Sequence, residues 1–310
     1  MKRVVSVSLG SSKRNHEIDE IILGEKIKIE RIGTDGSLAK AVNLIEELDG
    51  HVDAFGLGGT DLYISAGSRR YAIREAGKLA KAAKKTPVVD GSGLKNTLER
   101  KTIEYLSENE NIKFNSLKVL MVCAMDRFGM AESLEAKGAN MVYGDLMFAL
   151  GIPLPIYSLK ALDRLARVIA PVICQLPFKY IYPTGSGQDV RNEKSRFESY
   201  YYDADIIAGD FHYIKKHLPS RLSGKTIITN TITADDIVML TEIGIERLIT
   251  TTPNLGGRSF GTNVLEALLI TISDKNPQEI GSKDYDYLLE KLNFRPWIKN
   301  LQDQREALVE

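Results

Sequence analysis

The strongest constraint on the fold is the alternation of short apolar segments with helical stretches from residue 117 to residue 251. The apolar segments predict strands, and the stretches between them have helical spacing. Right-handed crossovers then return each strand in the same direction, so we expect a doubly wound, Rossmann-like parallel sheet. The predicted strands are Leu117–Ala124, Met141–Tyr143, Val172–Leu176, Asp205–Ala208, Thr226–Thr229 and Arg247–Thr251, and the predicted helices are Met130–Lys137, Leu159–Ile169, Phe211–Leu218, Ala234–Ile243 and Thr262–Ile272.

The first part of the chain mixes hairpins with helices. Residues 18–32 alternate around Gly24 and predict a hairpin, and Tyr63–Ile73 predicts a second one. The polar segment 108–111 predicts a domain boundary. The fold class is therefore α/β with two domains: an N-terminal α/β domain over 1–110, a Rossmann-like domain over 111–275, and a C-terminal helical tail over 276–310. Further predicted elements are strands Val4–Leu9, Val52–Leu57 and Pro87–Asp90 and helices Leu38–Leu48, Ala72–Lys85, Leu94–Glu108 and Tyr285–Leu292.

The charge balance narrows the class of partner. Lys and Arg together number 41, as do Asp and Glu, so nothing favours nucleic acid or an anionic membrane as partner. Cys123 and Cys174 lie in separate apolar runs and predict buried, reduced thiols, and the four histidines show no metal-ligand spacing. The chain enters a strand directly from Met1, so we expect a cytoplasmic protein. The sequence leaves the oligomeric state open.

The turn after the strand at 117–124 is where a dinucleotide fingerprint belongs. Its three glycine positions are held by Ala124, Asp126 and Gly129. Asp126 stands where the second glycine of the fingerprint lets the backbone approach the diphosphate of the dinucleotide, and it brings bulk and negative charge there. Arg127 can offset that charge or bind a phosphate itself. Asp145 follows about 20 residues later, the offset of a ribose-binding acid that favours NAD over NADP; alternatively, it caps the next helix.

A second motif, Asp90-Gly91-Ser92-Gly93-Leu94, opens the long helix that leads into this strand. From Asp90 to about Ala131 the chain resembles the shikimate/quinate 5-dehydrogenase family, and residues 263–267 occupy the place of that family's late cofactor-facing helix. As a whole it is similar to proteins called quinate 5-dehydrogenases. The resemblance implies a substrate-type N-terminal domain, NAD or NADP as cofactor, and a small hydroxylated carboxylic acid such as quinate or shikimate as substrate.

The resemblance also assigns roles to single residues. Asp90 corresponds to the family's aspartate, which pairs with a lysine in proton transfer from the alcohol. The family's lysine segment aligns with residues 58–63, where Thr60 fits but Tyr63 stands at the lysine position. Tyr63 could act as the acid if a cationic neighbour lowers its pKa. Arg69, Arg70 or Lys95 could be that neighbour or could replace the lysine. Further substrate-binding candidates are Arg69, with its neighbour Arg70, and the serines after the first strand, Ser11 and Ser12, accompanied by Ser8, Lys13 and Arg14.

A glycine-rich loop over 252–263 follows the last predicted strand of the sheet and opens a helix. Backbone amides beside Gly257, Arg258 and Ser259 could bind an anion, so these residues are cofactor-binding candidates. Two alternatives to a dehydrogenase remain. One is a non-catalytic protein that binds a small molecule or nucleotide on a dehydrogenase-like fold. The other is an enzyme that binds a phosphorylated ligand through Arg127 and the loop at 256–263.

Overall fold

A computed structural model of the 310-residue chain describes residues 1–66, 69–177, 196–255, 258–259, 261–273 and 275–302. The chain divides into two compact units, each built from three segments of sequence. We call them the N-terminal unit, which comprises Met1–Thr97, Val168–Gln188 and Phe260–Phe294, and the C-terminal unit, which comprises Leu98–Arg167, Asp189–Ser259 and Arg295–Glu310.

This division differs from the contiguous domains expected over 1–110, 111–275 and 276–310. The helices α10 (Thr262–Ser273) and α11 (Ser282–Lys291) belong to the N-terminal unit. The boundary falls inside α3 (Ser92–Glu108), not in the polar segment that follows it. Sequence patterns report only local structure, whereas α10 is placed by its packing on strands more than 200 residues away.

The sheet of the N-terminal unit has the strand order β2-β3-β1-β4-β7. β1 pairs in parallel with β3 and β4, and β4 pairs in parallel with β7. β2 and β3 form the predicted hairpin, whose turn places Leu23 and Gly24 at positive φ. The carboxyl ends of the four parallel strands therefore lie at one edge of the sheet. The strands are β1 (Lys2–Ser8), β2 (His16–Ile22), β3 (Glu25–Gly33), β4 (Ala54–Gly58) and β7 (Val88–Val89).

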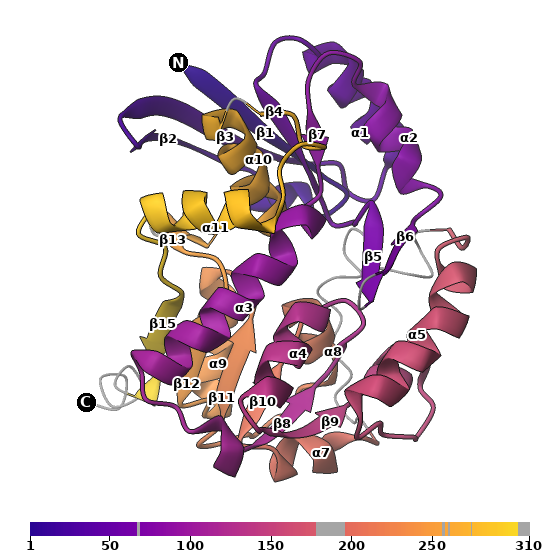
Figure 1. The fold of residues 1–310 in the computed structure, drawn as a ribbon, viewed down its shortest axis with the longest axis vertical. Helices are drawn as coiled ribbons and strands as arrows, with labels where there is room; N and C mark the ends of the chain where they lie inside the picture. The colour runs from indigo at the N-terminus through magenta and orange to yellow at the C-terminus, as the bar shows by residue number, and fades with distance from the viewer. Residues whose placement is uncertain (67–68, 178–195, 256–257, 260, 274, 303–310) are drawn as a thin grey trace. The chain divides into compact units, whose positions relative to one another are not determined.

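The two faces of this sheet carry residues of different size. Val5, Val7, Phe55 and Leu57 form a buried cluster with residues of α1 (Leu38–Leu48) and α2 (Ala76–Ala82), which lie side by side in Figure 1. The alternate positions are small and face α10: a Cβ on Gly56 would lie 2.7 Å from the carbonyl oxygen of Asn263. Since strand side chains alternate between faces, the small residues let α10 pack close to the sheet. They are Ser6, Ser8, Ala54, Gly56 and Gly58.

The second hairpin is also confirmed. β5 (Tyr63–Ala66) pairs with β6 (Arg69–Ala72) in antiparallel fashion. Helix α2 consequently begins at Ala76, four residues later than expected, because Ala72 already belongs to β6. The remaining element of this region is the short 3-10 helix η1 (Ser12–Arg14) after β1.

The sheet of the C-terminal unit has the order β15-β12-β11-β10-β8-β9. The five strands from β12 to β9 in this order run parallel to one another. β9 and β10 lie on opposite sides of β8, as in a doubly wound Rossmann-like sheet. The expected helical tail is corrected: β15 (Trp297–Asn300) joins the sheet antiparallel to β12. β15 pairs there because the backbone N–H and C=O groups along the edge of β12 would otherwise lack strand partners. The parallel strands are β8 (Lys118–Met121), β9 (Asn140–Tyr143), β10 (Ile206–Ala208), β11 (Thr226–Thr229) and β12 (Arg247–Thr250).

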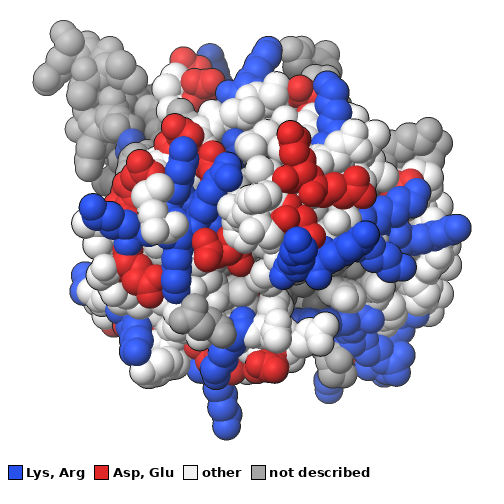
Figure 2. Space-filling view, turned by 90° about the horizontal axis from the view of Figure 1, so that it is seen from above, with Lys and Arg blue, Asp and Glu red and all other residues white. Residues whose placement is uncertain are grey.

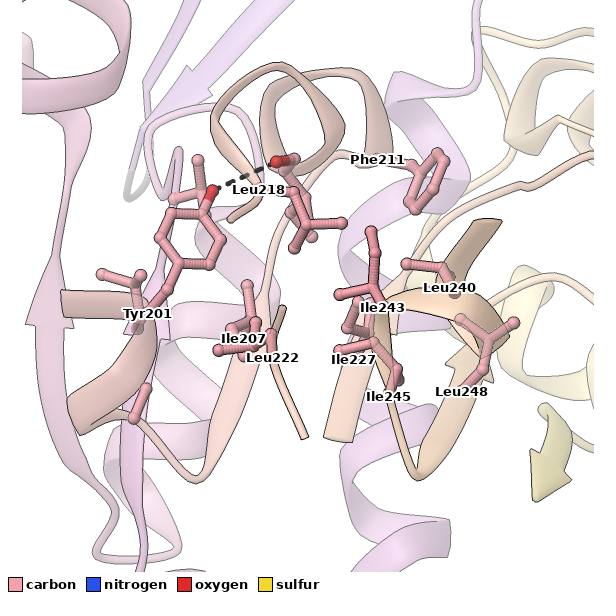
Figure 3. Close-up of a cluster of buried hydrophobic side chains, with 14 of the residues drawn as sticks. Tyr201, Ile207, Phe211, Leu218, Leu222, Ile227, Leu240, Ile243, Ile245 and Leu248 are labelled. Carbon is pink, nitrogen blue, oxygen red and sulfur yellow. Dashed lines mark hydrogen bonds between the residues drawn. The ribbon is translucent and has the colours of Figure 1, made fainter. Parts of the chain in front are cut away.

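Apolar side chains from strands and helices fill the core of this unit (Figure 3). Ile207, Ile227 and Leu248 of the sheet pack with Phe211 of α8 and Leu240 of α9. The buried Tyr201 hydroxyl donates to the carbonyl oxygen of Ile214 at 3.1 Å, so the ring is packed without an unsatisfied donor. The other elements are η2 (Phe114–Ser116), α4 (Phe128–Ala136), the π-helix η3 (Asp145–Ala149), α7 (Glu198–Asp203), α8 (Phe211–His217), α9 (Ala234–Ile243), β13 (Asn254–Leu255) and β14 (Arg258–Ser259).

Helix α5 (Leu159–Ile173) is longer than expected and takes the place of part of an expected strand. A helix over 159–169 followed by a strand over 172–176 was expected, but the helix continues through Pro171 to Ile173. Proline cannot donate to the preceding turn, and this loss normally ends a helix. Helical bonding resumes beyond it, because the Cys174 amide donates to the Ala170 carbonyl at 2.9 Å.

The charges on the surface are mixed, as the equal numbers of basic and acidic residues lead us to expect. On the face drawn in Figure 2, lysines and arginines are interspersed with aspartates and glutamates. Within the described ranges, no helix is long and apolar enough to cross a membrane.

Candidate functional site

The carboxyl edge of the N-terminal sheet carries most of the predicted substrate-binding and catalytic residues. β3 and β4 lie on opposite sides of β1, so the loops after β1 and β4 meet at a topological switch point. In open α/β sheets, ligands bind outside the carboxyl ends of the strands at such a point. The loops after β1, β3, β4 and β7 supply the side chains described next.

Arg31, near the end of β3, is a charged residue that the sequence analysis missed. It pairs in register with Ser6 and therefore points to the same face of the sheet as Ser8. Its guanidinium donates to the carbonyl oxygen of Ser11 at 3.1 Å and to the Ser8 hydroxyl at 3.0 Å. Both acceptors are neutral, and no carboxylate of the described residues forms an ion pair with Arg31.

The charge of Arg31 is incompletely compensated. Burial and the positive charge of Arg14 lower the pKa of Arg31 to about 10, and Asp35 only partly offsets them. The side chain remains protonated at neutral pH. A partly buried guanidinium that is bonded to neutral oxygens and is also subject to the positive charge of Arg14 favours an anion.

The predicted serines lie in the same loop. Ser11 contacts Arg31 through its carbonyl oxygen, while its hydroxyl accepts the amide of Lys13 at 3.2 Å. The Ser12 amide donates to Asp35 at 2.7 Å, and this bond lowers the pKa of Asp35. The structure therefore brings Ser11, together with Ser8, to the guanidinium, whereas the amide of Ser12 fixes Asp35.

Lys95 pairs with a carboxylate that sequence reasoning did not single out. Its Nζ lies 2.9 Å from Oδ2 of Asp61, and both side chains are largely buried. Lys95 lies in the first turn of α3, and Asp61 follows β4 directly after the buried Thr60. The Thr60 hydroxyl donates to the Asp61 carbonyl oxygen at 3.3 Å. Lys95, Asp61 and Thr60 therefore form one connected group at the sheet edge.

Asp90 has a different environment from the one its predicted role requires. Its Oδ1 accepts the Ser92 amide at 3.0 Å and the Ser92 hydroxyl at 2.7 Å, and its Oδ2 accepts the Leu62 amide. These bonds cap the start of α3 and tie it to the loop after β4. Lys95 is the lysine nearest this motif in the sequence, and its described partner is Asp61. The described bonds of Asp90 thus hold that loop, and its role in proton transfer stays a prediction.

Glu266 of α10, another residue that the sequence analysis missed, contacts the residue that follows Asp90. It is 3 % exposed, accepts the Gly91 amide at 2.6 Å, and accepts the Tyr285 hydroxyl at 2.6 Å. Burial and the charge of Asp90 raise the pKa of Glu266 to about 7. A Cβ at Gly93 would lie 2.2 Å from a carboxylate oxygen of Glu266, which explains the glycine there.

The remaining predicted residues of this unit lie on the β5–β6 hairpin. Tyr63 is 38 % exposed, and the guanidinium of Arg70 lies 5.7 Å from the centre of its ring. Arg69 is exposed on β6. Neither Tyr63 nor Arg69 has a described hydrogen bond to the Lys95–Asp61 pair.

In the C-terminal unit, Arg127 is the centre of a buried ion network. Its guanidinium lies 3.0 Å from Glu99, 2.9 Å from Asp210 and 3.3 Å from Asp126, and Arg127 is only 4 % exposed. Glu99 also accepts the Met130 amide at 3.0 Å. Three carboxylates therefore neutralise one guanidinium, and Arg127 has little charge left to offer a phosphate. The hypothesis of a phosphorylated ligand held by Arg127 loses its main support.

The other fingerprint residues surround the same turn. Gly129 is buried in the first turn of α4. Asp145 is fully buried, and its carboxylate accepts the amides of Ala124 at 3.1 Å and Met125 at 2.8 Å. Burial raises the pKa of Asp145 to about 6 against the lowering effect of these bonds. A dinucleotide needs free amides and a neutral or positive turn for its diphosphate, so these residues do not fit that group.

The anion-binding role expected for the loop at 252–263 stays a prediction, since the structure describes only part of this loop. Arg258 and Ser259 form β14, which pairs with β13, while Gly257 lies outside the described residues.

The sequence matches two family models. The first, described as a domain of unknown function (DUF8754), covers residues 93–301, about two thirds of the chain. The chain belongs to the DUF8754 family. The second, also described as a domain of unknown function (DUF8753), covers residues 3–90. The two matches meet at the turn between β7 and α3, and neither description names an activity. No curated protein matches this DUF8754 chain.

Solved structures share the α/β architecture at low similarity. A galactofuranose binding protein is 13 % identical, with 100 % of this chain and 98 % of that chain covered and a TM-score of 0.38. Glutamate dehydrogenase from Thermus thermophilus is 9 % identical (94 % and 74 % covered, TM-score 0.42). L-tryptophan dehydrogenase from Nostoc punctiforme is 12 % identical (94 % and 79 % covered, TM-score 0.37).

Proposed function

We propose that this protein binds a small hydroxylated carboxylic acid, of the quinate or shikimate class, at the carboxyl edge of the N-terminal sheet. The observation that carries the proposal is Arg31, a guanidinium bonded to two neutral oxygens. The positive charge of Arg14 also acts on it and lowers its pKa. A carboxylate would accept its remaining N–H groups and relieve the repulsion between the two arginines.

Polar groups at the same edge suit the hydroxyls of such an acid. The Ser8 hydroxyl contacts Arg31 directly, and the Lys95–Asp61 pair offers both a donor and an acceptor. An acid with several ring hydroxyls offers hydrogen-bond partners to groups of this kind, whereas a simple fatty acid does not. The chemistry of the edge therefore favours a polyhydroxylated acid.

The variant Arg31→Met tests this proposal. Losing a charge-assisted bidentate contact should weaken quinate or shikimate binding by at least roughly tenfold, which is about 1.4 kcal/mol. Isothermal titration calorimetry with each acid measures the effect. Lys28→Met is the matched control, because Lys28 lies on the same strand but on the opposite face, close to Glu17 and Glu30. Equal affinity in both variants, or no binding of either acid by the wild type, would contradict the proposal.

A second candidate function is oxidoreductase chemistry on the bound acid. The observation that favours it is the Lys95–Asp61 pair, since an amine fixed by a carboxylate can relay the proton of an alcohol. Asp61 then has the role that the resemblance to shikimate/quinate dehydrogenases gave to Asp90. The hydride would pass from the alcohol carbon to NAD or NADP held away from the described turn of the C-terminal unit, because the amides of that turn are bonded to Asp145.

If the protein is a dehydrogenase, Lys95→Met should lower the rate of NAD or NADP reduction with quinate by roughly 100-fold, because general acid–base catalysis contributes that much. Asp61→Asn should lower the rate in the same direction, while acid affinity measured by calorimetry changes far less. Lys78→Met, on the exposed side of α2, is the control. Wild-type protein that binds quinate but reduces neither dinucleotide would contradict the dehydrogenase function and support binding only.

A further inference from the structure

We infer that the carboxylate of Asp145 occupies the anion position of the turn after β8, so that the C-terminal unit excludes a diphosphate there. The amides of Ala124 and Met125 are the backbone donors at the point where a Rossmann-like unit receives a pyrophosphate. Both donate to Asp145, at 3.1 and 2.8 Å. A dinucleotide would have to displace this carboxylate before it could use either amide.

The position of Asp145 is fixed by the core of the unit. Asp145 opens η3 directly after Gly144, whose amide donates to the Met121 carbonyl at 2.8 Å. A Cβ at Gly144 would lie 2.4 Å from the ring of Phe148, so this ring packs against the backbone just before Asp145. Phe148 in turn makes an edge contact with Tyr201, with ring centres 5.6 Å apart. Moving the carboxylate out of the turn would therefore disturb packed aromatic groups.

Electrostatics oppose a diphosphate in the same place. Asp126, Asp210 and Glu99 share the one guanidinium of Arg127, and Asp145 adds a further carboxylate. The Asn230 side chain already donates to Asp210 at 2.8 Å, which completes the network at the end of β10. Two more negative charges would enter a site where acidic groups outnumber basic ones. The hydrogen bonds of Asp145 and the excess of acidic groups therefore both oppose binding of a diphosphate at this turn.

Calorimetric titration with inorganic pyrophosphate and with NAD tests the inference. Wild-type protein should bind neither at the turn, and Asp145→Ser, which frees both amides, should gain at least roughly tenfold in affinity for pyrophosphate. Asp235→Ser removes the same charge from an exposed position at the start of α9 and should gain nothing. A folded Asp145→Ser protein with no gain would overturn the inference.

The wild-type protein supplies a second test that does not depend on the stability of the variant. The amide resonances of Ala124 and Met125 in ¹H–¹⁵N spectra should stay in place when NAD or pyrophosphate is added. A shift of either resonance that saturates with added NAD would show that the dinucleotide reaches the turn, and would overturn the inference. Acid binding by the N-terminal unit is measured separately, so its outcome affects neither test.

Discussion

Arg127→Met is expected to lower the free energy of unfolding by about 3–5 kcal/mol, because it removes the guanidinium that pairs with the carboxylates of Glu99 and Asp210. Glu99 is completely buried, and Asp210 is largely so. An unpaired carboxylate in such a place loses its hydration without compensation. Urea unfolding followed by circular dichroism measures the loss.

Arg100→Met is the matched control for this prediction. Arg100 also forms an ion pair, with Glu132, but both side chains are exposed to solvent. Exposed pairs of this kind contribute about 0–1 kcal/mol, so the control should unfold at nearly the wild-type urea concentration. Similar losses in the two variants would mean that the network around Arg127 has no special structural role.

Glu266→Gln is expected to remove a pH dependence from the stability of the protein. Burial and Asp90 raise the pKa of Glu266 from 4.5 to about 7, so the folded state holds this proton more tightly than the unfolded chain does. Its stabilising contribution is therefore complete below pH 4.5 and is lost as the pH rises through about 7. The shift corresponds to about 3 kcal/mol between these limits. A glutamine keeps an acceptor for the Gly91 amide and carries no charge.

The measurement is the urea midpoint of both proteins at several pH values between 5 and 8.5. The urea midpoints of the two proteins should differ least in acid, and the variant should increasingly exceed the wild type as the pH rises, because only the wild type acquires a buried charge at this position. Glu47→Gln, at an exposed position of α1, should follow the wild type throughout. Parallel curves for Glu266→Gln and wild type would contradict the raised pKa.

Much of the fold could be predicted from local patterns. The strands and helices of the C-terminal unit, and both hairpins of the N-terminal unit, lie close to their expected positions because hydrophobic periodicity is a local property. Two elements differ from the expected ones for reasons that local patterns do not report. α5 continues through Pro171, and β15 forms because β12 offers it a free edge. Neither a helix that tolerates proline nor a strand that completes a distant sheet leaves a clear signal in sequence.

The candidate site was harder to predict than the fold. The sequence drew attention to Asp90 and Lys95, but each has a partner that lies elsewhere in the chain: Leu62 for Asp90, and Asp61 for Lys95. Arg31 sits in an ordinary alternating strand, and Glu266 sits in an apolar helix. Nothing in the residues around them marks either one as a functional candidate.

By itself, the sequence determined the α/β class, the parallel character of the second sheet and the turns where chemistry is concentrated, since these depend on periodicity and on glycine and aspartate placement. Only the tertiary structure decided what the charged side chains do. Asp145 could bind a ribose or cap a helix from sequence, but folding carries it to the amides of Ala124 and Met125. The physical reason is that a charged group acts on whatever lies within a few ångströms of it, and in this chain those neighbours come from distant segments.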